Sequence, residues 1–242
     1  MVNRTILRWW TLTLFPCATA CAQQRCSAEA KLLVSPTQTE SAVTVLHASK
    51  SSDENVYFFD TKESDLFSQG VMVRLRTAPK NDLTVKLRFN EGTSSTALLQ
   101  GNGAWKCETD VVGNEELTAY SLDSDWNKKS VPETGEQVYS ALTAEQQKLL
   151  GAARISIDWH RVKRRGEIHA IDWRVHPGGP LRAVTIELWE WPGGKILELS
   201  TRTVQGSGAG VLGQLRELAE RSGLAIEENQ TAKTGLFLNT RE

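Results

Sequence analysis

Hydrophobic and polar residues alternate along much of the chain, which is the pattern of strands with one buried face. The clearest case is the segment 70–89, GVMVRLRTAPKNDLTVKLRF, in which two alternating runs flank residues 79–82. Such a pair of runs around a turn predicts a β-hairpin. Because side chains alternate between the faces of a strand, one face is apolar and the other is almost purely cationic. A symmetric pairing would place Arg74 opposite Lys86, where like charges repel.

Further runs of this kind predict strands in both halves of the chain. They lie at 28–34, 56–59, 104–112, 154–164, 167–175, 183–191 and 195–204, with a last strand near 233–239. Helices are predicted at 36–46, at 65–68, after a capping box of Thr143 with Gln146, and at 211–222 before Gly223. Several strands with one polar and one apolar face can close into a barrel, which removes exposed edges.

Charged residues share one face of several other strands. The shared faces carry Glu29 with Lys31, Lys106 with Glu108 and Asp110, and Glu198 with Ser200 and Arg202. A two-residue Gly193-Gly194 loop would put Glu187 on the face of Glu198 and opposite Ser200. Two interpretations stay open. These faces meet water, or they line a tunnel with cationic walls for phosphate and carboxylates for a divalent metal.

The composition of the chain limits the classes of binding partner that we expect. The chain has 242 residues, 40% of them hydrophobic, and a formal net charge of -1. Without an overall excess of positive charge, neither nucleic acid nor a membrane surface is an expected partner. A membrane span needs about 20 consecutive apolar residues, and no such segment follows the N-terminus. The basic hairpin is therefore a local feature, and oligomeric state is left open.

The N-terminus has the pattern of an export signal. Arg4 and Arg8 precede an apolar stretch at 9–20, and Ala20-Cys21-Ala22 has the small-x-small form of a signal-peptidase site. We therefore expect a signal peptide over 1–22, cleavage after Ala22, and a periplasmic or secreted protein. A lipid anchor on Cys21 is the less favoured alternative, because residues 18–20 lack the large aliphatic residue usual in lipoprotein signals.

Two cysteines remain after that cleavage. Cys26 lies three residues before Glu29, and Cys107 precedes Glu108, so each cysteine faces away from the neighbouring carboxylate. If the carboxylates point into a barrel, both cysteines point out of it. An exterior disulfide between them is then a hypothesis that suits an oxidising compartment.

The segment YFFDTKESDLFSQGVMVRLR, followed by LTVKLRF and KCETD, resembles the CYTH domain of the triphosphate tunnel metalloenzymes. The matching positions are Asp60-Thr61, Leu66, Gly70, Arg74, Arg76 and Lys86. The resemblance covers 55–112 and extends to 28–34. It is looser from 150 onward, where ILELS resembles the late Glu-x-Glu strand and Lys233 the C-terminal tunnel lysine. It implies an α+β fold, a closed antiparallel eight-stranded β-barrel with flanking helices, as a single domain over 27–240.

The resemblance also implies roles for individual residues. Phosphate or substrate binding falls to Lys31, Arg74, Arg76, Lys86 and Lys233, with Arg161 as a further candidate from a basic cluster at 161–165 that is otherwise a solvated edge. Metal binding, with Mg²⁺ or Mn²⁺, falls to Glu108, Asp110, Glu187 and Glu198. Catalytic, water-orienting roles fall to Glu29 and Glu198. The partner implied is a triphosphate or another polyanionic small molecule.

Two positions depart from the family pattern. Ser27 stands where the early Glu-x-Glu-x-Lys strand carries its first carboxylate, and Ser200 stands where the late Glu-x-Glu strand carries its second. Three hypotheses follow: a metal-dependent triphosphatase acting on inorganic or nucleoside triphosphate, a non-catalytic periplasmic binding protein for polyanions, and a structural barrel whose inner charges pair with one another. The serines favour the second more than the family alone would.

Overall fold

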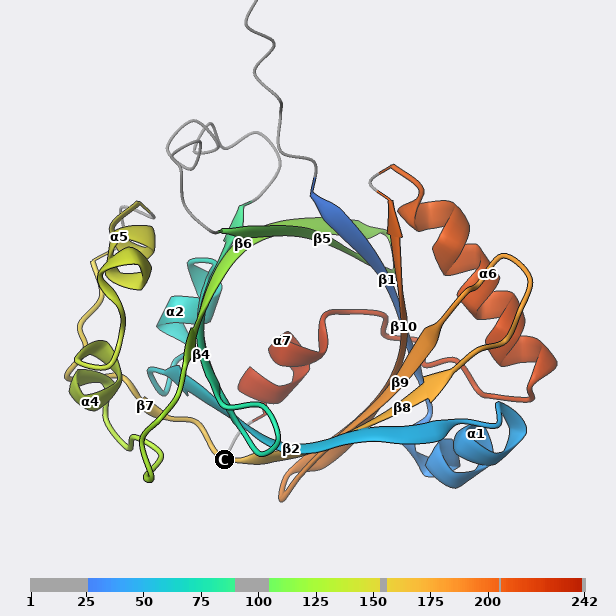
Figure 1. Cartoon of the computed structure of the whole chain (residues 1–242), viewed down its shortest axis with the longest axis horizontal. Helices are drawn as coiled ribbons and strands as arrows, with labels where there is room; N and C mark the ends of the chain where they lie inside the picture. Colours follow the sequence, from blue (N-terminus) through green and yellow to red (C-terminus); the bar gives the residue numbers. More distant parts are fainter. Residues whose placement is uncertain (1–25, 90–104, 153–155, 205, 241–242) are drawn as a thin grey trace, which may run out of the picture.

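A closed β-barrel with helices on its outer surface organises the chain (Figure 1). The computed structural model describes residues 26–89, 105–152, 156–204 and 206–240. The strands are β1 (Ser27–Val34), β2 (Ser49–Asp60), β3 (Val71–Thr77), β4 (Asp82–Phe89), β5 (Lys106–Val112), β6 (Glu115–Asp125), β7 (Lys163–Arg164), β8 (Ile168–Val175), β9 (Val184–Trp191) and β10 (Gly194–Val204). The helices are η1 (Pro36–Gln38), α1 (Thr39–Val45), α2 (Asp65–Ser68), α4 (Gly135–Tyr139), α5 (Ala144–Ala152), α6 (Gly208–Arg221) and α7 (Lys233–Leu238).

Nine of these strands close the barrel. Their order is β3-β4-β6-β5-β1-β10-β9-β8-β2, and β2 pairs back onto β3, whereas β7 pairs with β2 outside the ring. All neighbours in the ring are antiparallel except β1 and β5. The expected closed barrel is confirmed, with nine strands instead of eight and one parallel pair among otherwise antiparallel neighbours. Directions cannot alternate all the way around a ring of nine, so one parallel pair is required.

The apolar faces of the strands point outward and are covered by helices. On one side, Leu32 and Leu199 pack with Leu215 of α6, and on the other side Val85 packs in the cluster that contains Leu149 of α5. Figure 1 shows α6 beside β1 and β10, with α4 and α5 on the opposite side of the barrel. These two cores lie outside the ring, whereas a third lies inside it, where α7 packs on apolar residues of the inward faces of β2, β3 and β9. Charged side chains line the rest of the interior.

Strand register differs from the symmetric expectation in two hairpins. In β3–β4, Arg74 lies opposite Thr84, and Lys86 lies opposite Met72, so the two cations are not directly opposed. In β9–β10, Glu187 lies opposite Glu198 and not opposite Ser200, because Trp191 pairs with Gly194 around the turn. The second shift brings two carboxylates face to face.

Two predicted strands form only in part or not at all. Of the segment 154–164, the described part is strand only at Lys163–Arg164, and Ile157, Trp159 and Val162 pack on the outer core. The C-terminal segment is the helix α7. A closed barrel offers no free edge for another strand, and a helix pairs its backbone groups internally.

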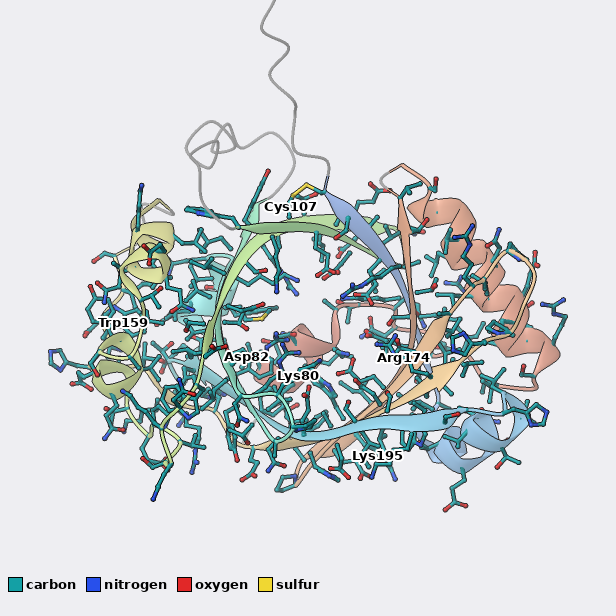
Figure 2. All side chains as sticks on the ribbon, viewed as in Figure 1. Lys80, Asp82, Cys107, Trp159, Arg174 and Lys195 are labelled. Atoms are coloured by element: carbon teal, nitrogen blue, oxygen red, sulfur yellow. A yellow bond between two sulfur atoms is a disulfide. The ribbon has the colours of Figure 1, made fainter. Side chains whose placement is uncertain are left out.

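The two cysteines form a disulfide between β5 and the residue before β1, with their Cα atoms 4.6 Å apart. Figure 2 shows the sulfur of Cys107 on the outer side of the barrel wall. The expected signal peptide and the alternative lipid site at Cys21 lie outside the described residues. Within the described part of the chain, no helix has the length and hydrophobicity needed to cross a membrane.

Candidate functional site: the charged tunnel

The interior of the barrel is crowded with charged side chains of both signs. Nearly all the charged residues expected in the site lie on the inward faces: Lys31, Arg74, Arg76, Lys86, Glu29, Glu108, Asp110, Glu187 and Glu198. Lys233 reaches the same space from the first residue of α7. The interpretation of the charged faces as solvated surfaces is therefore wrong.

Three carboxylates meet on the seam between β1 and β5. The parallel register places Glu29 beside Asp110, and Glu108 lies one step along the same face. One oxygen from each of the three lies within 4.8 Å of the others. Oxygen ligands at this spacing suit Mg²⁺ or Mn²⁺, so the residues fit a divalent cation.

Two lysines compete for the same carboxylates. The ammonium of Lys31 is 2.8 Å from Asp110 and 3.3 Å from Glu29, and that of Lys86 is 3.5 Å from both Asp110 and Glu108. Burial alone would raise the pKa of Asp110, but the charges of Lys31 and Lys86 outweigh it and hold that pKa well below its usual range. Asp110 is therefore ionised at any physiological pH.

A second acidic group lies on β8, β9 and β10. Asp172, Glu187 and Glu198 occupy one row across these strands, and the Lys233 ammonium donates to Glu187 and, at 2.9 Å, to Glu198. Burial would raise the pKa of Glu187, yet the contact with Lys233 lowers it to about 2. Burial dominates at Glu198 and raises its pKa despite Lys233. Glu187 is thus held ionised, and Glu198 is the better proton acceptor of the two.

The two tunnel arginines differ in how their charge is balanced. Arg76 forms a two-pronged contact with Asp82, with Nε 2.9 Å from one carboxylate oxygen, and its Nη1 is 3.8 Å from Glu54. Arg74 makes one long contact of 3.4 Å with the hydroxyl of Thr84, its Nε is buried without a partner, and it pairs with no described carboxylate. Burial, followed by the charge of Arg76, lowers the pKa of Arg74.

Comparison with solved structures shows what this arrangement resembles. HpAC1 from Hippeastrum, a candidate adenylyl cyclase with a dominant triphosphatase activity, superposes with a TM-score of 0.56 over 86% of this chain and 93% of its own, at 16% identity. A candidate adenylate cyclase from Bacillus halodurans gives 0.57 over 88% and 98%, at 13% identity. The chain has the CYTH tunnel fold. No protein-family model and no curated protein matches the sequence.

Three positions of the CYTH pattern do not place a charged side chain in the tunnel, and each makes a structural hydrogen bond instead. Asp60 accepts hydrogen bonds from the backbone N–H groups of Thr61, Leu66 and Phe67, so it caps α2. Ser200 donates to Glu29 at 3.1 Å, which orients that carboxylate. Ser27 donates to the backbone carbonyl of Cys107 beside the disulfide.

Arg161 is not part of the tunnel. Its guanidinium pairs with Glu63 and Asp65 outside the barrel, and more than half of its side chain is exposed. The expected substrate-binding role therefore does not fit its position. The charge runs at 161–165 belong to a segment that packs on the outer core instead of forming a barrel strand.

Sequence reasoning missed some inward charges. Asp172 and Glu54 both lie on inward faces, and Glu54 has one carboxylate oxygen buried without a partner. Burial raises the pKa of both. Asp172 shares one face of β8 with Ala170 and Arg174, so the period-2 pattern could have found it. Glu54 was missed because the strand was expected to begin at residue 56, whereas β2 begins at Ser49.

Proposed function

We propose that the tunnel binds a triphosphate, or a related polyanion, and hydrolyses it with Mg²⁺ or Mn²⁺. The observation that carries this proposal is Arg74, a tunnel guanidinium with no carboxylate partner among the described residues. A charge removed from water without a partner is costly, and a phosphate oxygen would offset that cost. HpAC1, which has the same fold, is described by a dominant triphosphatase activity.

Arg74 supplies the first phosphate contact, and the lysines complete it. Lys31, Lys86 and Lys233 are each paired with two carboxylates in the ligand-free tunnel. Their flexible ammonium groups can turn from a carboxylate to a phosphate oxygen without moving the backbone. Arg76, anchored by Asp82, provides a fixed positive charge beside Arg74.

Glu29, Glu108 and Asp110 would hold the metal ion, with Glu187 on β9 and Glu198 on β10 as a second carboxylate set. A bound divalent ion supplies charge neutralisation on the transferred phosphoryl group, and such transfer needs no protein nucleophile. Glu198, whose pKa is raised by burial, is suited to accept a proton from the attacking water. Ser200 fixes the orientation of Glu29 for the same step.

A specific observation also favours a second function, polyanion binding without cleavage. Four of the five expected tunnel cations are already neutralised by carboxylates, and Ser27 and Ser200 each replace a carboxylate of the family pattern. A tunnel that retains its anion contacts and lacks part of its metal shell would bind a phosphate chain and release it unchanged. The experiment below distinguishes the two.

We propose further that the protein acts outside the cytoplasm, as one domain over 27–240 after removal of 1–22. The Cys26–Cys107 disulfide supports this location, because such bonds persist in oxidising compartments. Expression of the full chain in a bacterium, followed by cell fractionation and N-terminal sequencing, tests it. A mature N-terminus at Gln23 in the periplasm is expected, and an intact Met1 in the cytoplasm would contradict the proposal.

Phosphate release from tripolyphosphate and ATP, with Mg²⁺, Mn²⁺ or EDTA, tests the enzymatic function. We expect metal-dependent release that falls at least about a hundredfold in Arg74→Gln and in Glu198→Gln. Arg161→Gln is the matched control, because it removes the same charge from the outer surface. Thermal shift with the same ligands is measured in parallel. Stabilisation without turnover would establish the binding function. If the ligands cause neither stabilisation nor turnover, only the structural barrel is left.

A further inference from the structure

The disulfide lies on the same two strands as the three carboxylates of the β1–β5 seam. Glu29 lies three residues after Cys26, and Glu108 directly follows Cys107. Ser27, the first residue of β1, lies beside Glu108 in the parallel register and donates a hydrogen bond to the backbone carbonyl of Cys107 at 3.2 Å. The disulfide therefore joins the beginnings of the two strands that supply these carboxylates.

Two features weaken the pairing of β1 with β5. In the described ring this pair is parallel, and parallel pairing is slightly less stable per residue than antiparallel pairing. The register also places Glu29 beside Asp110, where like charges repel each other. Lys31 offsets this repulsion by contacting both carboxylates. A divalent cation would compete with that ammonium for the same oxygen atoms, so the lysine alone cannot hold the strands together in the metal-bound state.

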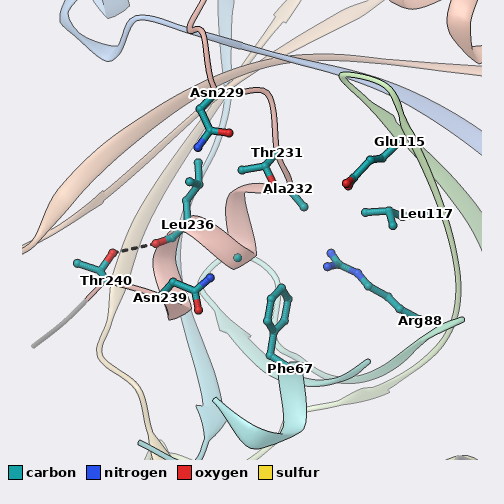
Figure 3. A pocket seen from close by; sticks show the side chains of 11 residues that line it. Phe67, Arg88, Glu115, Leu117, Asn229, Thr231, Ala232, Leu236, Asn239 and Thr240 are labelled. Atoms are coloured by element: carbon teal, nitrogen blue, oxygen red, sulfur yellow. Dashed lines mark hydrogen bonds between the residues drawn. The ribbon is translucent and has the colours of Figure 1, made fainter. Parts of the chain in front are cut away.

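The tunnel side of this seam borders an open space. A cavity of about 580 Å³ is lined by Arg88 and by Leu117, which lies opposite Asp110 on β6 (Figure 3). This part of the tunnel has room for the water molecules and phosphate oxygens that complete the coordination of Mg²⁺. The disulfide lies on the outer side of the same wall (Figure 2). The carboxylates are thus open to ligands from inside, and the covalent link between their strands is on the outside.

We propose that the Cys26–Cys107 disulfide positions the metal-binding carboxylates and makes metal affinity depend on redox state. The bond keeps Glu29 and Glu108 close together before the metal binds, so metal binding does not have to bring the strands together. Reduction by a dithiol transfers two electrons and two protons to the disulfide, which leaves one thiol on each cysteine and converts the dithiol to a cyclic disulfide. The seam then loosens, and Mg²⁺ or Mn²⁺ binds more weakly.

This inference rests on the proposed function in one respect, because it concerns the same metal site. In a compartment that keeps thiols reduced, the chain binds metal weakly. The site reaches full affinity only where disulfides persist. The disulfide therefore limits metal-dependent hydrolysis of triphosphates before export.

Titration of the full chain with Mn²⁺ in the oxidised form and after reduction with dithiothreitol tests the inference, with free Mn²⁺ measured by electron paramagnetic resonance. We expect reduction to weaken Mn²⁺ binding by about tenfold or more, as for other groups that orient metal ligands. The double variant Cys26→Ser/Cys107→Ser should bind Mn²⁺ as weakly as the reduced protein and should not respond to dithiothreitol. Asp110→Asn should bind weakly in both forms, which places the measured ion at the seam.

Hydrogen exchange in EDTA distinguishes local loosening from unfolding. After reduction, the amides of β1 and β5 should exchange faster, whereas those of the β9–β10 hairpin should keep their protection. Equal loss of protection in both regions would overturn the inference, because the disulfide would then act on the whole fold. Removal of the dithiol and re-oxidation should restore Mn²⁺ affinity.

The outcomes also separate this inference from the proposed function. Equal Mn²⁺ affinity of the oxidised and reduced proteins, with turnover retained, would overturn the inference and leave hydrolysis standing. Redox-dependent Mn²⁺ binding without turnover would support the inference and contradict hydrolysis. Failure of the oxidised protein to bind Mn²⁺ would overturn both.

Discussion

Asp110 pairs with both Lys31 and Lys86 inside the tunnel, so removing its charge should lower the stability of the barrel more than most single substitutions. Its side chain is 4% exposed and lies 2.8 Å from Lys31 and 3.5 Å from Lys86. Asp110→Asn keeps the shape and removes the charge that balances both ammonium groups. Breaking a buried ion pair in this way costs about 3–5 kcal/mol. We expect the lower end, about 3 kcal/mol, because Lys31 keeps Glu29 and Lys86 keeps Glu108.

Urea unfolding in EDTA at pH 7 measures the effect without metal. Asp53→Asn is the control, since that carboxylate pairs with Lys50 and His169 on the surface and should change stability little. The pKa of Asp110 is lower in the folded chain than in the unfolded chain, so its contribution is complete above about pH 5 and is lost as the pH falls. The difference in the free energy of unfolding between the unaltered protein and Asp110→Asn should therefore become smaller from pH 5 to pH 3. A loss below about 1 kcal/mol at pH 7 would refute the reasoning.

Three further predictions follow from other contacts. Arg74→Gln should abolish the thermal stabilisation by tripolyphosphate while leaving the ligand-free protein as stable or more stable; an unchanged ligand shift would contradict the role of Arg74. The Cys26–Cys107 disulfide closes a loop with a separation of 81 residues, so its reduction should lower the free energy of unfolding in urea by about 4 kcal/mol. Reduction should also weaken Mn²⁺ binding at the β1–β5 seam. Equal urea midpoints for the oxidised and reduced proteins would show that the disulfide does not stabilise the fold. Lys233→Met leaves Glu187 and Glu198 opposed without a counter-charge. Their pKa values should rise, so this variant should gain stability as the pH falls from 7 to 5, and a flat pH profile would argue against the pairing.

The alternation of residues along the strands was enough to place most of the tunnel. Period alone placed Lys31, Arg74, Lys86 and Asp110 on the polar faces of their strands, and the resemblance to the CYTH domain then turned those faces inward. The outward cysteines followed from the same rule, and their disulfide confirms it. The fold class was then narrowed by the resemblance around Asp60-Thr61, which turned out to be a helix cap and not a site.

Pairing partners could not be read from the sequence. The register of Glu187 with Glu198 depends on a two-residue turn at Pro192-Gly193, one residue earlier than the expected Gly193-Gly194 loop. The number of strands depends on how the ring closes, which is a property of all nine strands together. The helix at Lys233–Leu238 has a strand-like composition, and only the closed barrel excludes the strand. Each of these features is decided by distant contacts.

A crystal structure of the full chain with Mn²⁺ and tripolyphosphate tests the central claim most directly. Anomalous scattering locates the metal, and the phosphate chain is seen beside it. We predict Mn²⁺ bound by Asp110 with Glu29 or Glu108, and a phosphate oxygen within hydrogen-bond distance of the Arg74 guanidinium. A phosphate chain bound only outside the barrel, with Arg74 and the carboxylates in the contacts described above, would contradict the account.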